Sequence, residues 1–161
     1  MLEFLEGVKA IAIHDGRTHH QHILVWNTSQ FARLADSEAS ALVIDDSPTL
    51  TTLCRLLLSS VGIETQIAND ADEALATLAT ESFGLILLDL EMPLTNGIAL
   101  ATKLKESTEG RDMPILALTN KDLGDCESDC RRAGIDGYIQ KPIDIDKAME
   151  LAQFFGIKTN S

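Results

Sequence analysis

The sequence predicts an α/β fold in which a parallel sheet is covered by helices on both faces. From Ala41 onward, five short apolar runs alternate with segments whose apolar residues recur at helical spacing. This alternation is typical of parallel strands joined by crossover helices. Leu85–Leu88 is continuously apolar, as expected of a central strand buried on both faces. The expected strands are Ala41–Asp45, Ile63–Ala68, Leu85–Asp89, Ile115–Leu118 and Gly137–Gln140.

The helices between these strands follow from apolar spacing and from the residues at their ends. Ser47 followed by Pro48 indicates the start of the first helix, and Asn69 or Asp70 precedes the second. Gly134 stands where the fourth helix is expected to end. The apolar faces, in chain order, consist of Leu50, Leu53, Leu57, Leu58 and Val61; Ala71, Ala74, Leu75 and Leu78; Ile98, Ala101 and Leu104; Leu123, Cys126, Cys130 and Ala133; and Ala148, Leu151, Ala152 and Phe155.

Residues 1–40 do not follow this alternation and are expected to form an N-terminal extension. Val8–Ile13 and Ile23–Trp26 are candidate strands, with an Asp-Gly pair near the turn between them, which favours a hairpin. Asn27–Leu34 is a candidate short helix. Ala35–Ser40 has the small and polar composition of a linker.

Charge and composition narrow the function classes. The formal net charge of −12 repels phosphate backbones and anionic membrane surfaces, so direct binding to nucleic acid or to a membrane is not expected. No apolar run approaches the roughly 18 residues that span a bilayer, and the acidic N-terminus is unlike a secretory signal. Three cysteines without the spacing of a disulfide framework suit a reducing compartment. We expect a cytoplasmic protein.

Polar residues stand at the carboxyl ends of the expected strands, where open α/β sheets bind ligands. Asp45 and Asp46 follow the first strand, and Asp89 ends the third. Thr119 follows the fourth strand, and Lys141 follows the fifth. Each residue alone has a structural interpretation, such as a helix cap or a solvated charge, but the five together predict one site.

The residue types at this site point to phosphoryl transfer. Asp45, Asp46 and Asp89 would repel one another unless a cation neutralised them, and hard carboxylate ligands of this kind suit Mg²⁺. An ionised Asp89 can attack phosphorus in line, because carboxylates form acyl-phosphate intermediates. The ammonium of Lys141 and the hydroxyl of Thr119 are expected to bind the remaining equatorial oxygens.

Motifs at four strand ends also carry a family resemblance. They are Asp45-Asp46, Asp-Leu-Glu-Met-Pro-Leu-Thr-Asn-Gly over 89–97, Ala117–Thr119 and Tyr138–Pro142. In this order they resemble the receiver domain of two-component response regulators. The resemblance covers about residues 41–157, between the extension over 1–40 and a tail over 158–161. It implies a flavodoxin-like, doubly wound sheet of five parallel strands in the order 2-1-3-4-5, with five helices.

The resemblance also implies partners and a switching mechanism. A histidine kinase or a histidine phosphotransfer protein would supply the phosphoryl group, and a downstream protein target would receive the signal. Phosphorylation would bias a two-state equilibrium and change the surface formed by the fourth helix, fifth strand and fifth helix. Asp89 resembles the family's phosphoacceptor, and Lys141 resembles its phosphate-binding lysine. Asp45 and Asp46 resemble the acidic pair that binds the metal, and the backbone carbonyl of Glu91 would be a further Mg²⁺ ligand. Thr119 resembles the switch hydroxyl, and Tyr138 resembles the switch aromatic residue.

Three functional alternatives follow. The first is a competent receiver, alone or as one module of a larger kinase, that promotes only its own phosphorylation and dephosphorylation and so is not an enzyme in the usual sense. The second is a pseudo-receiver that binds proteins without being phosphorylated. The third is an aspartate-based phosphatase, but Asp45–Thr49 does not supply the Asp-x-Asp-x-Thr loop of that class. We favour the first. Output is then expected through protein contacts, with homodimerisation and the N-terminal extension as candidate routes.

Two further clusters have structural interpretations. Cys126 and Cys130 lie four residues apart on the apolar face of the fourth helix and are expected to pack in the core. The histidines between positions 14 and 22 lack cysteine or acidic partners at metal-ligand spacing, which favours a solvated turn.

Asn120 departs from the family pattern, which usually has a small residue after the switch hydroxyl. Its larger side chain is expected to alter access to the site, and Glu91 and Lys121 stand at positions that tune the lifetime of the phosphorylated state. Asn120→Ala is therefore expected to change the rate of phosphorylation or of dephosphorylation severalfold. Both rates are measured with a small phosphodonor. Equal rates in the two proteins would contradict this expectation.

Overall fold

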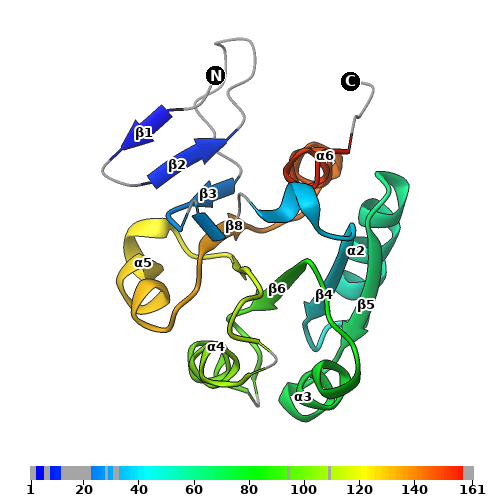
Figure 1. Ribbon diagram of the computed structural model, residues 1–161. Coiled ribbons are helices and arrows are strands. Elements are labelled where there is room, and N and C mark those ends of the chain that lie inside the picture. The colour runs from blue at the N-terminus through cyan, green and yellow to red at the C-terminus, as the bar shows by residue number, and fades with distance from the viewer. Residues whose placement is uncertain are drawn as a thin grey trace.

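The expected alternation of strands and helices is present in the computed structural model (Figure 1), which describes residues 3–5, 8–11, 23–27, 29–30, 33–93, 95–108 and 110–157. Five parallel strands follow one another in the predicted order, with β6 at the centre, and the predicted α/β doubly wound fold is confirmed. Across this sheet the strands are β5 (Glu64–Ala68), β4 (Ser40–Ile44), β6 (Leu85–Asp89), β7 (Ile115–Thr119) and β8 (Gly137–Gln140).

Five helices cover the two faces of this sheet, and side chains cap four of them. The Ser47 hydroxyl accepts a hydrogen bond from Leu50 N at 3.3 Å, and the Asp70 carboxylate accepts one from Glu73 N at 2.7 Å, as the start signals predict. Gly134 adopts a positive φ of 86° just after a helix, where a left-handed residue ends it. The helices are α2 (Pro48–Ser60), α3 (Ala71–Thr80), α4 (Gly97–Glu106), α5 (Leu123–Arg132) and α6 (Ile145–Phe154).

Successive strand residues pack into two different core layers. Val43 and Leu87 belong to the layer beneath α2 and α6, whereas Ile44 and Leu88 belong to the layer beneath α3, α4 and α5. All four side chains are fully buried, and burial of such a side chain contributes about 1.5–3 kcal/mol. The alternation follows from the two-residue period of a strand, and in β6 and β7 the only polar residues, Asp89 and Thr119, stand at the carboxyl ends.

The sheet is larger than predicted, because three antiparallel strands extend it beyond β8. They are β1 (Glu3–Leu5), β2 (Val8–Ile11) and β3 (Ile23–Val25), and β3 pairs with β8. Strands β2 and β3 lie within the two ranges expected to form a hairpin, whereas β1 was not predicted. The full order is therefore β1-β2-β3-β8-β7-β6-β4-β5.

The connection between β3 and β4 agrees in part with the helix expected over Asn27–Leu34 and the linker expected over Ala35–Ser40. Ser29 and Gln30 have helical backbone, as predicted. Within the described residues, a 3-10 helix, η1 (Arg33–Asp36), crosses the boundary expected at residue 35. Short 3-10 turns commonly connect other elements of secondary structure. At the end of η1, Ser37 N donates a hydrogen bond to Leu34 O at 3.1 Å, which is the i to i+3 pattern of a 3-10 helix. The tail over 158–161 and the histidines between 14 and 22 lie outside the described residues. Within the described ranges, none of the helices combines the length and apolar character needed to cross a membrane.

Candidate functional site

The carboxyl ends of β4 and β6 place two buried acids side by side. Ile44 pairs with Leu88 in the parallel register, so Asp45 and Asp89, the next residue of each strand, lie at the same edge of the sheet. Their exposed fractions are 1% and 3%, respectively. Backbone N–H groups fix both carboxylates: Ser47 N donates to Asp45 Oδ1 and Glu91 N donates to Asp89 Oδ1, each at 3.0 Å.

Asp46 joins these two acids to form a cluster with the character of a cation site. Carboxylate oxygens of Asp45, Asp46 and Asp89 all lie within 4.8 Å of one another. Burial raises the pKa of Asp45 to about 6 against the opposing hydrogen bond from Ser47, and the charge of Asp89 adds to the increase. Asp45 Oδ2 is buried and has no hydrogen-bond partner among the described residues. A hard divalent cation fits this set, because it would ligate the open oxygen and offset the repulsion.

Lys141 brings a single positive charge to the acids from the end of β8. Its ammonium lies 2.8 Å from Asp89 Oδ1, 3.6 Å from Glu91 Oε2 and 4.0 Å from Asp45 Oδ2. Burial alone lowers the pKa of Lys141, but the hydrogen bond and charge of Asp89 outweigh it and raise the pKa. The side chain is therefore cationic at neutral pH.

The Glu91 side chain occupies a set of donors beside Asp89, a contact that the sequence did not predict. The Thr119 hydroxyl donates to Glu91 Oε1, and Asn120 N donates to the same oxygen at 3.0 Å. The Lys141 ammonium is close to the second carboxylate oxygen of Glu91. A carboxylate in this position satisfies the hydroxyl, the backbone N–H and the ammonium that would otherwise face an incoming anion.

Tyr138 lies in β8, three residues before Lys141, and points into the core beneath α5 rather than toward the acids. Its ring is 3% exposed, and burial raises the pKa of its hydroxyl to about 12. That hydroxyl donates to Lys121 O at 2.6 Å, and Lys121 N donates to Thr119 Oγ1 at 3.0 Å. Tyr138 is therefore connected to the site through the loop that follows β7.

The structure thus brings together the side chains of the acids, Thr119 and Lys141 at one edge of the sheet, and Tyr138 reaches them indirectly. Asn120, whose side chain is exposed, contributes its backbone N–H. The buried thiols of Cys126 and Cys130 lie in the core layer beneath α5, and burial raises the pKa of Cys130 to about 12. These thiols are poorly suited to redox or metal chemistry.

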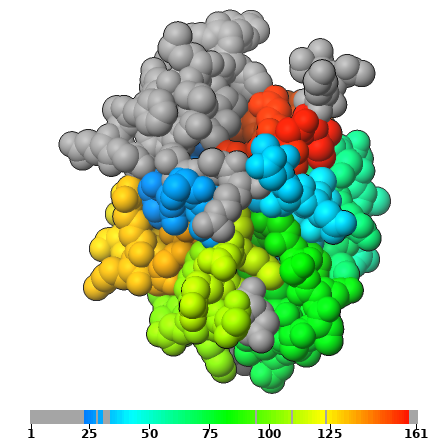
Figure 2. Space-filling view, in the orientation of Figure 1, coloured from blue at the N-terminus to red at the C-terminus, as the bar shows by residue number. Residues whose placement is uncertain are grey.

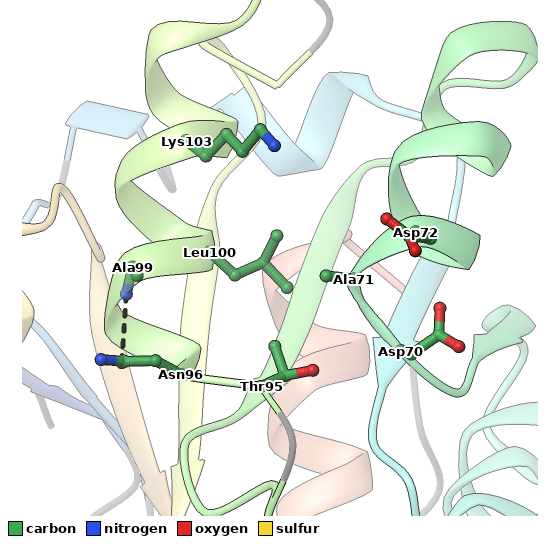
Figure 3. A pocket seen from close by; sticks show the side chains of 8 residues that line it. All are labelled: Asp70, Ala71, Asp72, Thr95, Asn96, Ala99, Leu100 and Lys103. Atoms are coloured by element: carbon green, nitrogen blue, oxygen red, sulfur yellow. Dashed lines mark hydrogen bonds between the residues drawn. The ribbon is translucent and has the colours of Figure 1, made fainter.

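A separate cavity of about 510 Å³ lies between α3 and α4 (Figure 3). Asp70 and Asp72 line it from one side, and Asn96 and Lys103 line it from the other. None of the predicted site residues contributes to its walls, so the cavity is distinct from the acidic cluster.

Comparison with known proteins agrees with this architecture. The family model of the response regulator receiver domain matches residues 41–153. The polar-differentiation response regulator DivK of Brucella anthropi is 30% identical over 111 residues, which are 69% of this chain and 90% of DivK. The chemotaxis protein CheY4 of Vibrio cholerae superposes with a TM-score of 0.68 at 26% identity, over 73% of this chain and 98% of CheY4.

A second similar structure contains a metal. It is the receiver domain of the sensor histidine kinase PA1611 from Pseudomonas aeruginosa PAO1, with a magnesium ion coordinated in its active site cleft. The two structures superpose with a TM-score of 0.65 at 25% identity, over 74% of this chain and 99% of that domain.

Proposed function

Since this chain belongs to the response regulator receiver domain family, we propose that it accepts a phosphoryl group on Asp89 in the presence of Mg²⁺ and thereby relays a two-component signal. The observation that carries the proposal is the position of Asp89. Its carboxylate lies 2.8 Å from the Lys141 ammonium and within the cluster formed with Asp45 and Asp46. A buried nucleophile, a cation and a metal-binding set therefore meet at one point.

Mg²⁺ would be held by the carboxylates of Asp45, Asp46 and Asp89, and we assign the backbone carbonyl of Glu91 as a further ligand. When bound, the ion supplies positive charge to the phosphoryl oxygens and to the acids around them. The open oxygen of Asp45 and the raised pKa of its carboxyl group support this assignment.

The side chains of this protein have separate tasks in the transfer. A carboxylate oxygen of Asp89 attacks the phosphorus of the donor, and the bond between phosphorus and the donor's nitrogen or oxygen breaks with its electron pair leaving on the donor. The Lys141 ammonium and the Thr119 hydroxyl bind equatorial phosphoryl oxygens, as does the N–H of Asn120. These donors stabilise the negative charge on the phosphoryl oxygens once the Glu91 carboxylate no longer occupies them.

We propose a histidine kinase or a histidine phosphotransfer protein as the donor, and a downstream protein as the target. The domain acts over residues 41–157, promotes only its own phosphorylation and dephosphorylation, and works in the cytoplasm. The net charge of −12 counts against direct contact with nucleic acid.

The decisive experiment offers acetyl phosphate to the purified chain with Mg²⁺ or with a chelator. We expect the intact mass to increase by one phosphoryl group only when Mg²⁺ is present. An unchanged mass under both conditions would contradict the proposal and favour the pseudo-receiver. Steady release of phosphate from a generic phosphomonoester would instead indicate a phosphatase.

Removing the Glu91 carboxylate is expected to accelerate phosphorylation. In Glu91→Ala, the Thr119 hydroxyl and the Asn120 N–H no longer have to leave a charged acceptor before they bind the phosphoryl group. A hydrogen bond to a charged group contributes about 1.5–3 kcal/mol, and the partial exposure of Glu91 places the effect near the lower value, so we expect about a tenfold faster rate. The rate is measured from the mass increase over time with acetyl phosphate.

Glu73→Ala is the matched control for this variant. The control variant also removes one carboxylate, which accepts a hydrogen bond from Asn69. Glu73 lies at the start of α3, outside the acidic cluster. Its rate is expected to equal that of the wild type. A slower rate in Glu91→Ala would mean that the carboxylate assists the transfer instead of competing with the phosphoryl group.

Mg²⁺ binding is expected to weaken below neutral pH, because the ion requires ionised Asp45. With a pKa of about 6, this carboxylate is mostly ionised at pH 7 and mostly protonated at pH 5. The proton and the metal compete, so the apparent affinity is expected to be about tenfold lower at pH 5 than at pH 7. Calorimetric titration with Mg²⁺ at the two pH values measures this, and Asp45→Asn is expected to bind more weakly with less dependence on pH. Equal wild-type affinities would contradict the assignment of Asp45.

A further inference from the structure

The edge of β8 next to the proposed site is covered by the chain's own N-terminal segment. In β3, Leu24 pairs with Tyr138 and Val25 pairs with Gly137. Ile23 and Val25 are fully buried, and Leu24 packs in the same core layer as Tyr138. Figure 2 shows the first described residues after β2, coloured blue, lying against α5, coloured orange. We call Ile23–Asn27 the N-terminal clasp.

Gly137 permits the close approach of the clasp. A Cβ atom at this position would lie 2.5 Å from Leu24 O and 2.5 Å from a methyl group of Leu116, closer than a side chain can approach. The absence of a side chain therefore lets the backbone of β3 fit against β8 without displacing the core.

Trp26 and Asn27 fasten the end of the clasp to the turn between α5 and β8. Trp26 Nε1 donates to Ile135 O at 2.6 Å, and the Arg131 guanidinium lies 5.1 Å from the centre of the indole ring. Trp26 N and Asn27 N both donate to Asp136 O. The Asn27 amide donates to Asp136 Oδ1 at 2.7 Å.

Asp136 itself is rigidly held, so these contacts are anchored in the receiver domain. It is 2% exposed, and its Oδ2 accepts from the Lys105 ammonium at 2.8 Å and from Ile115 N at 2.9 Å. The two carboxylate oxygens thus divide their contacts between the domain and the clasp. A charge-assisted network of this kind fixes position as well as contributing energy.

A continuous series of contacts joins the clasp to the proposed phosphorylation site. Thr119 Oγ1 accepts from Lys121 N, and Lys121 O accepts from the Tyr138 hydroxyl. Tyr138 in turn pairs with Leu24 across the sheet. If Thr119 moves toward a phosphoryl group, Lys121 and then Tyr138 lose their present positions, and the pairing with β3 is disturbed.

We propose that the N-terminal clasp is an intramolecular ligand of the face formed by α5 and β8, and that phosphorylation of Asp89 weakens its attachment. The inference rests on the proposed function, since Asp89 supplies the signal. In the unphosphorylated protein the clasp closes the hydrogen-bonding edge of β8 and covers part of α5, so a protein target of this face must compete with it. Phosphorylation shifts that competition toward the target.

Trp26 is the only tryptophan of the chain, so its fluorescence reports the clasp directly. The experiment follows emission, acrylamide quenching and intact mass in the same sample after acetyl phosphate and Mg²⁺ are added. We expect the mass increase to be accompanied by a red shift and by at least about a twofold increase in quenching. A phosphorylated protein with unchanged Trp26 fluorescence would overturn the clasp inference alone. A sample that gains no mass would overturn the proposed function together with it.

Loosening the clasp provides the reciprocal test. Asn27→Ala removes one hydrogen bond to Asp136, and linkage then requires the phosphorylated state to become more accessible. We expect about a fivefold higher affinity for beryllofluoride, a phosphoryl analogue, with Mg²⁺ in calorimetric titration. Thr80→Ala, which loses an exposed hydrogen bond at the end of α3, is the control and should bind as the wild type does. Wild-type affinity in Asn27→Ala, with unchanged circular dichroism, would overturn the coupling.

Discussion

Replacing Asp89 with asparagine is expected to abolish phosphorylation by acetyl phosphate. The amide lacks the nucleophilic carboxylate oxygen, and loss of a nucleophile of this type reduces the rate by at least about a thousandfold. The fold should persist, because an amide oxygen can still accept the hydrogen bonds that Glu91 N and Lys141 now donate to Asp89 Oδ1. Intact mass measured over time with Mg²⁺ and acetyl phosphate tests the prediction.

Asp72→Asn is the matched control, since it makes the same chemical change outside the acidic cluster at the start of α3. It should be phosphorylated at the wild-type rate. If Asp89→Asn still gained one phosphoryl group, the acceptor would be another residue, and the assignment of Asp89 would be wrong. Circular dichroism of both variants separates a chemical loss from a failure to fold.

The position of Asp89 shows why so much of the site could be predicted from sequence. The apolar run Leu85–Leu88 demanded a strand buried on both faces, and all of its residues are indeed buried in β6. The carboxyl ends of parallel strands share one edge, so the acid that ends this strand had to lie near Asp45. Local patterning and one rule of topology were sufficient to bring these residues together.

The contacts of the Glu91 side chain and of the N-terminal clasp could not be predicted from the sequence and were found only in the structure. The family resemblance assigned the backbone carbonyl of Glu91 to Mg²⁺. The contacts of the Glu91 side chain with Thr119 and Asn120 could not be predicted, because the conformation of a long, flexible side chain depends on neighbours from other strands. Strand β3 was expected to pair in a hairpin, but three residues carry no signal for which sheet edge they join. The hydrogen bond between Asn27 and Asp136 spans 109 positions of sequence, beyond the reach of any local pattern.

Replacing Lys141 with methionine is expected to lower the rate of phosphorylation by about a hundredfold to a thousandfold. The methionine keeps much of the apolar stem but lacks the ammonium that lies 2.8 Å from Asp89 Oδ1. A preorganised donor to developing negative charge is worth about that much in a site shielded from water. Lys141→Arg should be intermediate, because the guanidinium keeps the charge but spreads it over a larger planar group. Rates are measured by intact mass with acetyl phosphate.

The same substitution has a second consequence that a purely structural role for Lys141 would not produce. The charge of Lys141 lowers the pKa of Asp45, so removing it is expected to raise that pKa above its present value of about 6. The loss of Mg²⁺ affinity on acidification should then begin at a higher pH in Lys141→Met than in the wild type. Lys103→Met, which removes an exposed ammonium from α4, should change neither the rate nor this pH dependence. If Lys141→Met matched that control in both measurements, the ammonium would have no part in binding the phosphoryl group or in setting the charge of the acids.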